Sequence, residues 1–171
     1  MPSLFTFVSR CLWFLPTIAI VGIDRISKIE MLSRLNIGES YAVLPFLNFR
    51  LAFNKGAAFS FLDHASGWQN LFFIVLALLV SIYIVVLVLM DSKEKSFLSQ
   101  MGLVFILGGA LGNAWDRIQF SIVIDFINLH FQNWHFAIFN VADSAITIGA
   151  FLLIWHWLRL WRNDKSKIIK R

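Results

Sequence analysis

Long apolar runs separated by short polar segments dominate the hydrophobic pattern of this chain. Between Phe72 and Met90, only Ser81 and Tyr83 interrupt an otherwise apolar stretch. At about 1.5 Å per helical residue, such a stretch can cross a hydrocarbon core of about 30 Å. We place this span at about 70–90, and two further runs give spans at about 97–115 and 142–160. The pattern therefore predicts a protein built mainly from membrane-spanning helices.

A further span is expected near the N-terminus, where the apolar run CLWFLPTIAIVGI is short for a complete crossing. The run is also similar to the core of a signal peptide, but no small-x-small cleavage pattern follows it. Asp24 and Arg25 follow instead, so we extend the helix through them and place the span at about 11–31. This extension puts Asp24 and Lys28 on one helical face, one turn apart.

The basic residues indicate how these four spans are oriented. With four spans, both termini lie on one side of the membrane, and this side holds Arg10 and the tail RLWRNDKSKIIKR. Basic residues beside membrane spans favour the cytoplasmic side. We therefore expect both termini in the cytoplasm and two segments, at about 32–68 and 116–141, that face outward.

Both outward segments contain strand-like alternation. Apolar and other side chains alternate from Leu47 to Asn54, and residues 120–126 repeat the pattern with Asp125 on the other side from the apolar residues. A period of two is typical of a half-buried strand. The expected fold is a membrane protein, mainly α, with four transmembrane helices and a small extracytoplasmic β-sheet on the outer surface. We treat residues 1–171 as a single integral membrane domain.

Composition narrows the classes of function. The chain is 58% hydrophobic and 15% charged, with a net charge of +5, whereas about a quarter of the residues in a soluble domain are charged. Because the basic residues gather at the ends of spans, binding to nucleic acid is not indicated. The single cysteine, Cys11, forms no internal disulfide, and the histidines show no metal-ligand spacing. We expect no metal or cofactor, contact with membrane lipid, and a monomer.

Three acids at the outward ends of the last two spans are candidates for chemistry. Asp116 ends the third span, Asp143 begins the fourth, and Asp125 lies between them. Two carboxylates that share one proton can activate a water and protonate a leaving group without a metal. Other interpretations stay open at this point. Asp143 can be a helix cap, and Asp116 can form a surface ion pair with Arg117.

Two other classes of protein fit the same pattern. Buried acids also mark ion paths, so a small transporter or proton-relay protein is the main alternative. Such a protein needs acids at the middle of the membrane, whereas these acids lie toward one face. A purely structural membrane scaffold is the third class, and it leaves the polar cluster unexplained.

Several sequence blocks together resemble the lipoprotein signal peptidases, also called signal peptidase II. The blocks, in chain order, are DRISK, NKGAAFSF, GGALGNAWDR, VIDF and FNVADSAI, and they spread over most of the chain from Asp24 to Gly149. Two positions depart from the pattern of that family. Ser121 stands where glycine is frequent, and Ala137 stands where proline is frequent.

The resemblance implies an aspartic peptidase of the bacterial cytoplasmic membrane, with Asp125 and Asp143 as the catalytic pair. Its substrates would be prolipoproteins whose lipobox cysteine carries diacylglycerol, cut just before that cysteine near the outer face of the membrane. Residues that would bind substrate or support the aspartates are Asp24, Lys28, Asn54, Gly56, Asn113, Asp116, Arg117 and Asn140.

Overall fold

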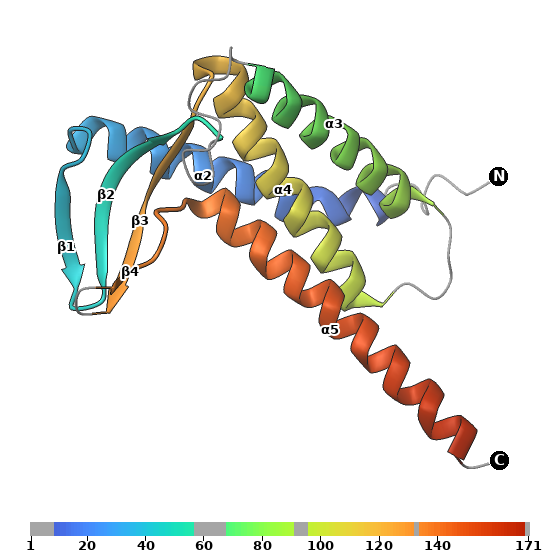
Figure 1. Cartoon of the computed structure of the whole chain (residues 1–171). Coiled ribbons are helices and arrows are strands. Elements are labelled where there is room, and N and C mark those ends of the chain that lie inside the picture. The colour runs from blue at the N-terminus through green and yellow to red at the C-terminus, as the bar shows by residue number, and fades with distance from the viewer. Residues whose placement is uncertain (1–8, 57–67, 91–95, 132–133, 170–171) are drawn as a thin grey trace.

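The computed structural model describes residues 9–56, 68–90, 96–131 and 134–169. Four long helices and four strands follow a short 3-10 helix (Figure 1). Their bounds are η1 Leu12–Phe14, α2 Leu15–Arg34, β1 Ser40–Leu44, β2 Leu47–Asn54, α3 Trp68–Leu89, α4 Phe97–Phe120, β3 Val123–Phe131, β4 Trp134–His135 and α5 Val141–Ile169. The prediction of a mainly helical membrane protein with a small sheet is confirmed.

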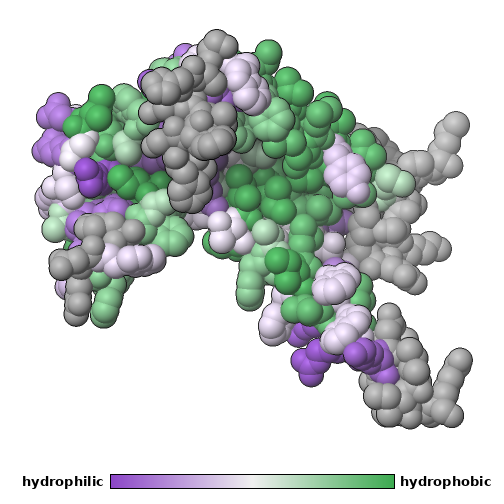
Figure 2. Space-filling view, in the orientation of Figure 1, coloured by the Kyte–Doolittle hydropathy of each residue, from purple (hydrophilic) through white to green (hydrophobic). Residues whose placement is uncertain are grey.

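Among the described residues, three helices have the length and apolar composition to cross a membrane. They are α3, α4 and the part of α5 from Val141 to Asn163. Helix α2 is 20 residues long, which at about 1.5 Å per residue matches a hydrocarbon core of about 30 Å. Because α2 contains several charged residues, it is not among the three apolar helices. The membrane span at about 11–31 therefore stays a prediction. Figure 2 shows apolar side chains gathered over α3 and α4, as expected of a surface in contact with lipid.

Helix α4 lies at the centre of the bundle and packs against α2, α3 and α5. Close approach depends on glycines of α4, as the small-residue spacing of Gly108 and Gly112 predicts. A Cβ atom on Gly108 would lie 2.9 Å from Ile20 of α2, and one on Gly112 would lie 2.8 Å from Asp24. At Gly109, which lies between them, a Cβ would come within 2.2 Å of the main-chain oxygen of Ala142.

Helix α4 extends beyond its predicted end at about residue 115. It continues to Phe120, so Asp116 and Arg117 lie within the helix. The helix ends because Ser121 adopts the left-handed conformation at φ 59°, and its N–H donates to the carbonyl of Arg117 at 3.0 Å. Side chains rarely adopt this conformation without cost, whereas a glycine, which has no Cβ atom, adopts it freely.

The strands form one antiparallel sheet in the order β1-β2-β3-β4. Ala52 of β2 stands opposite Asp125 of β3, and the register shifts between Phe49 and Ala52. The sheet lies at one end of the helical bundle, away from the start of α2 and the end of α5 (Figure 1). Strand β3 differs from the predicted half-buried pattern, because every residue from Val123 to Phe126 is buried.

Candidate active site

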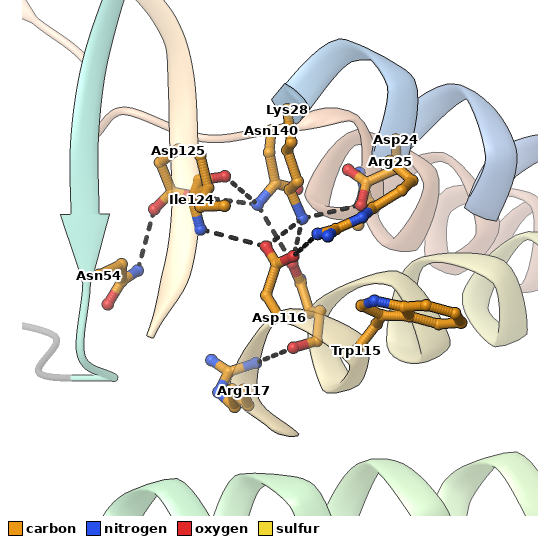
Figure 3. A network of polar contacts seen from close by, with 12 residues as sticks. Asp24, Arg25, Lys28, Asn54, Trp115, Asp116, Arg117, Ile124, Asp125 and Asn140 are labelled. Atoms are coloured by element: carbon orange, nitrogen blue, oxygen red, sulfur yellow. Dashed lines mark hydrogen bonds and ion pairs between the residues drawn. The ribbon is translucent and has the colours of Figure 1, made fainter. Parts of the chain in front are cut away.

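Asn140, the residue directly before α5, joins the two carboxylates of the predicted pair. Its side chain is fully buried, and its Nδ2 donates to Oδ1 of Asp125 at 2.7 Å. Its main-chain N–H donates to Oδ2 of Asp143 at 3.2 Å. The sheet and the start of α5 therefore bring Asp125 and Asp143 to one place. Figure 3 shows Asn140 between Asp125 and the neighbouring charged residues.

Asp143 also caps its helix, as one interpretation of the sequence predicts. The N–H of Asp143 donates to Oδ1 of Asn140 at 2.8 Å, which completes a reciprocal capping arrangement with the contact described above. Its other oxygen, Oδ1, accepts from Nδ2 of Asn113 at 2.7 Å. Each carboxylate oxygen has two lone pairs, so capping leaves acceptor capacity for a water or substrate.

Asp125 lies on β3 and is only 2% exposed. Its Oδ2 accepts from Nδ2 of Asn54, at the end of β2, at 3.1 Å (Figure 3). Burial, and after it the negative charge of Asp143, raise the pKa of Asp125 to about 7. The amide donors of Asn54 and Asn140 oppose this rise, because they favour the ionised carboxylate. Asp125 therefore exchanges its proton near neutral pH.

A buried cluster of charges lies beside this pair (Figure 3). The Nζ of Lys28 is 2.7 Å from Asp24 and 2.8 Å from Asp116, and the Lys28 side chain is fully buried. Arg25 also approaches Asp116, at 3.4 Å. The alternative interpretation of Asp116 as a surface partner of Arg117 is therefore wrong. Asp116 is 1% exposed and binds basic residues of α2.

The two acids of this cluster hold the main chain beside the carboxylate pair. Oδ1 of Asp24 accepts the N–H of Ala142, the residue before Asp143, at 2.9 Å. Oδ2 of Asp116 accepts the N–H of Ile124, the residue before Asp125, at 3.2 Å. Each acid thus fixes the backbone one residue ahead of one member of the pair. The sequence shows that Asp24 and Lys28 are neighbours, but no local pattern indicates these two long-range contacts.

Gly56 and Arg117 meet at Phe73, at the edge of the site. The Arg117 guanidinium lies 4.9 Å from the centre of the Phe73 ring, and one of its nitrogens donates to the carbonyl of Asn113 at 3.4 Å. Gly56 has φ +87°, and a Cβ on it would lie 2.7 Å from the same ring. Its N–H donates to Oδ1 of Asn54 at 2.8 Å. The rest of the NKGAAFSF block lies outside the described residues.

Arg25 is a member of the site that the sequence analysis did not single out. It donates to Gln119 at 2.7 Å and lies over the rings of Trp115 and Phe120. Its position directly after Asp24 was the available signal. In the part of the chain that the structure describes, no three side chains of His, Cys, Asp or Glu converge to hold a metal ion.

The fold and the site together define a membrane protein whose helices and sheet bring two carboxylates to one end of a helical bundle. Comparison with known proteins identifies the class further. The sequence profile of signal peptidase (SPase) II matches residues 16–159, and the chain belongs to this family. It is therefore a membrane peptidase.

Individual relatives agree with this assignment. A lipoprotein signal peptidase from Polynucleobacter necessarius is 50% identical over 142 residues, covering 83% of this chain and 86% of that protein. One from Coxiella burnetii is 47% identical over 147 residues, covering 86% and 88%. A bacterial membrane enzyme solved by the in meso method at 2.3 Å resolution is 31% identical, with a TM-score of 0.77 over 91% of this chain and 90% of that one.

Proposed function

We propose that this peptidase is an aspartic endopeptidase that removes the signal peptide from prolipoproteins. Its substrate carries diacylglycerol on the lipobox cysteine, and the cut falls just before that cysteine. One observation carries the proposal. Asn140 holds the carboxylates of Asp125 and Asp143 together, and the pKa of Asp125 lies near 7. Such a pair holds one proton near neutral pH, as hydrolysis by two carboxylates requires.

The raised pKa favours Asp125 as the proton donor and Asp143 as the base. Asp143 takes a proton from a water molecule while the water oxygen bonds to the scissile carbonyl carbon, and Asp125 gives its proton to the carbonyl oxygen. The proton on Asp143 then passes to the leaving nitrogen as the C–N bond breaks, and Asp125 takes a proton back from a hydroxyl of the intermediate as the C=O bond re-forms. The products are a signal peptide with a free carboxylate and a lipoprotein with a free amine on its cysteine.

The surrounding residues divide into two groups by exposure. Lys28, Asn113 and Asn140 are buried beside the pair, so we assign them to positioning, together with Asp24 and Asp116. Asn54, Gly56 and Arg117 lie at the rim and have some exposure, so they are placed to meet the substrate main chain. Arg117 offers a planar donor fork suited to a carbonyl or carboxylate.

The proposed membrane arrangement has four spans, with α2 as the first and both termini in the cytoplasm. The active site then lies near the outer face, where the acyl chains of the substrate hold its scissile bond at the interface. We expect the enzyme to act as a monomer. A cysteine at Lys55, in a Cys11→Ser background, should react with an impermeant thiol reagent added from outside. Labelling from the cytoplasmic side alone would invert this topology.

The transporter alternative is less well supported. Asp125 lies on a strand and Asp143 lies in the first turn of α5. Neither acid lies midway along a span, where a proton relay needs its carboxylates.

The test of the proposed function is cleavage of a lipidated proprotein by purified enzyme, scored by a gel shift. Asp125→Asn and Asp143→Asn should each abolish cleavage, because an amide can neither accept nor supply the required proton. Asp164→Asn removes a carboxylate at the opposite end of α5 and should keep wild-type activity. Addition of a chelator should leave the rate unchanged. Near wild-type cleavage by either variant of the pair would remove that residue from the catalytic role.

A further inference from the structure

A cavity lies away from the carboxylate pair, between the last turns of α2 and the first two strands. Its volume is about 630 Å³, within the range of about 300–1,000 Å³ that is usual for small-ligand sites. The lining residues are Glu30, Met31, Arg34 and Leu35 of the α2 end, Glu39 and Tyr41 of the first hairpin, and Phe49 of β2. None of them belongs to the active site described above.

The charges in this cavity carry a net negative sign. Glu30 and Arg34 form an ion pair one helical turn apart. Glu39 is held in place because its Oε2 accepts both the main-chain N–H of Asn36, at 2.8 Å, and the Asn36 side chain, at 3.1 Å. Its other oxygen accepts no hydrogen bond from the residues that the structure describes. Two carboxylates against one guanidinium favour a ligand that has a cation with N–H donors beside an anionic group.

Aromatic and apolar walls complete the site. Tyr41 and Phe49 are direct partners in the β1–β2 register, so their rings lie on one face of the sheet. Aromatic faces attract an ammonium group. Met31 and Leu35 add apolar surface from α2. The ligand is therefore amphipathic, with a charged head and an apolar body.

The outer face of α2 indicates that this ligand is a lipid. Ile23 and Ile26 are 58% and 70% exposed, and they fall on the same helical stripe as Glu30 and Arg34, at spacings of three and four residues. From Ile23 to Arg34 the helix rises about 16 Å, close to half of a hydrocarbon core of about 30 Å. The stripe thus passes from an apolar half suited to an acyl chain to a charged half suited to a headgroup.

We infer that this cavity binds a phospholipid whose headgroup carries a primary ammonium, that is, one of the ethanolamine class. The ammonium lies between Glu30 and Glu39, the phosphate lies on Arg34, and an acyl chain follows Ile26 and Ile23. The inference rests on the proposed membrane arrangement, in which this end of α2 reaches the membrane surface. The bound lipid would join the first hairpin to α2, on the same sheet that carries the active site.

The experiment is a titration of purified protein with short-chain phosphatidylethanolamine, phosphatidylcholine and phosphatidylglycerol, read by native mass spectrometry. Wild type should bind the ethanolamine lipid at least about tenfold more tightly than the choline lipid, since choline has no N–H to donate to a carboxylate. Glu39→Gln should remove that preference. Arg34→Gln should weaken both lipids alike, because both carry the phosphate. Asp164→Asn, which removes a negative charge at the far end of α5, should keep the preference.

Equal binding of the two lipids by wild type, or an unchanged preference in Glu39→Gln, would overturn the inference. A substrate site would give a different result. In that case Glu39→Gln would raise KM only for proproteins with lysine shortly after the cysteine, and the preference between the two lipids would persist. This result would also overturn the lipid assignment. Cleavage by wild type is scored separately, so loss of the lipid site and failure of the proposed function are distinguishable.

Discussion

Removal of the Asn54 side chain tests the electrostatics of the carboxylate pair directly. Asn54 ends β2, and its Nδ2 donates to Oδ2 of Asp125 at 3.1 Å. This bond favours the ionised form of Asp125, so it lowers a pKa that burial and the charge of Asp143 raise. Asn54→Ala should therefore raise the pKa of Asp125 above its value of about 7.

The size of the shift follows from the strength and exposure of the bond. A hydrogen bond to a charged group contributes about 1.5–3 kcal/mol. Asn54 is exposed, so water replaces much of the lost donor, and we expect about half of that amount to remain, roughly 0.75–1.5 kcal/mol. Since one pKa unit corresponds to about 1.4 kcal/mol, the pKa should rise by roughly half a unit to one unit.

The assay is the pH dependence of kcat/KM with a lipidated proprotein. The proposed mechanism needs Asp125 protonated, so activity falls as the pH rises through the pKa of Asp125. In Asn54→Ala this falling limb should move to higher pH. Asn54 also accepts a hydrogen bond from the N–H of Gly56, so its removal can lower the rate as well. The prediction is therefore tested by the pH at which the falling limb lies, and not by the rate. Asn48→Ala, on the same strand but opposite Asn128, should leave the limb in place. A limb that stays in place or moves to lower pH in Asn54→Ala would refute the reasoning.

Five further substitutions have expected outcomes, each measured by unfolding in detergent. Asp125 has a pKa of 3.8 in the unfolded chain and about 7 in the folded one. The free energy of unfolding of the wild type therefore falls as the pH rises through this window. Asp125→Asn should be more stable than wild type by up to about 4 kcal/mol at pH above 7, and equally stable below pH about 4. Lys28→Met leaves two buried carboxylates without their shared cation and should cost about 3–5 kcal/mol. Gly109→Ala forces α4 and α5 apart and should cost about 1–3 kcal/mol, whereas Gly22→Ala, with nothing within 4 Å of the new Cβ, should be tolerated. Ser121→Gly relieves the left-handed conformation and should stabilise the protein by about 1 kcal/mol; a lower unfolding temperature would contradict this account.

The sequence predicts much of the helical part of the fold because the membrane imposes a local rule. A span needs a continuous apolar run, and the runs that became α3, α4 and α5 are plain in the chain. The end of α4 was placed too early because Asp116 and Arg117 interrupt the apolar run. The helix continues there because Asp116 is buried against Lys28 and Arg25, so charge in the sequence did not mean exposure.

In the candidate site, too, some features could be predicted from the sequence and others could not. The acids were predicted from their types and positions, and the amides from the resemblance to signal peptidase II. The structure brings Asp125, Asp143 and Asn140 together. What holds them was beyond sequence reasoning, because it depends on contacts between distant parts of the chain. Asp24 binds the main chain of a residue 118 positions away. The register shift in β2 that places Ala52 opposite Asp125 likewise has no local signal.

The buried charges beside the pair are balanced, and this balance matters for the proposed chemistry. Asp24 and Asp116 contribute two negative charges, and Lys28 and Arg25 contribute two positive ones. An unbalanced Lys28 would stabilise the ionised form of Asp125 and draw its pKa down, so that the proton would be lost at neutral pH. In the balanced cluster, Lys28 is the weakest of the influences on Asp125, after burial, the facing carboxylate and the two amide donors. The cluster can therefore hold the backbone on both sides of the pair by strong, charged hydrogen bonds while adding little net field. The position of the proton is then set by burial and by the second carboxylate, as a catalytic pair requires.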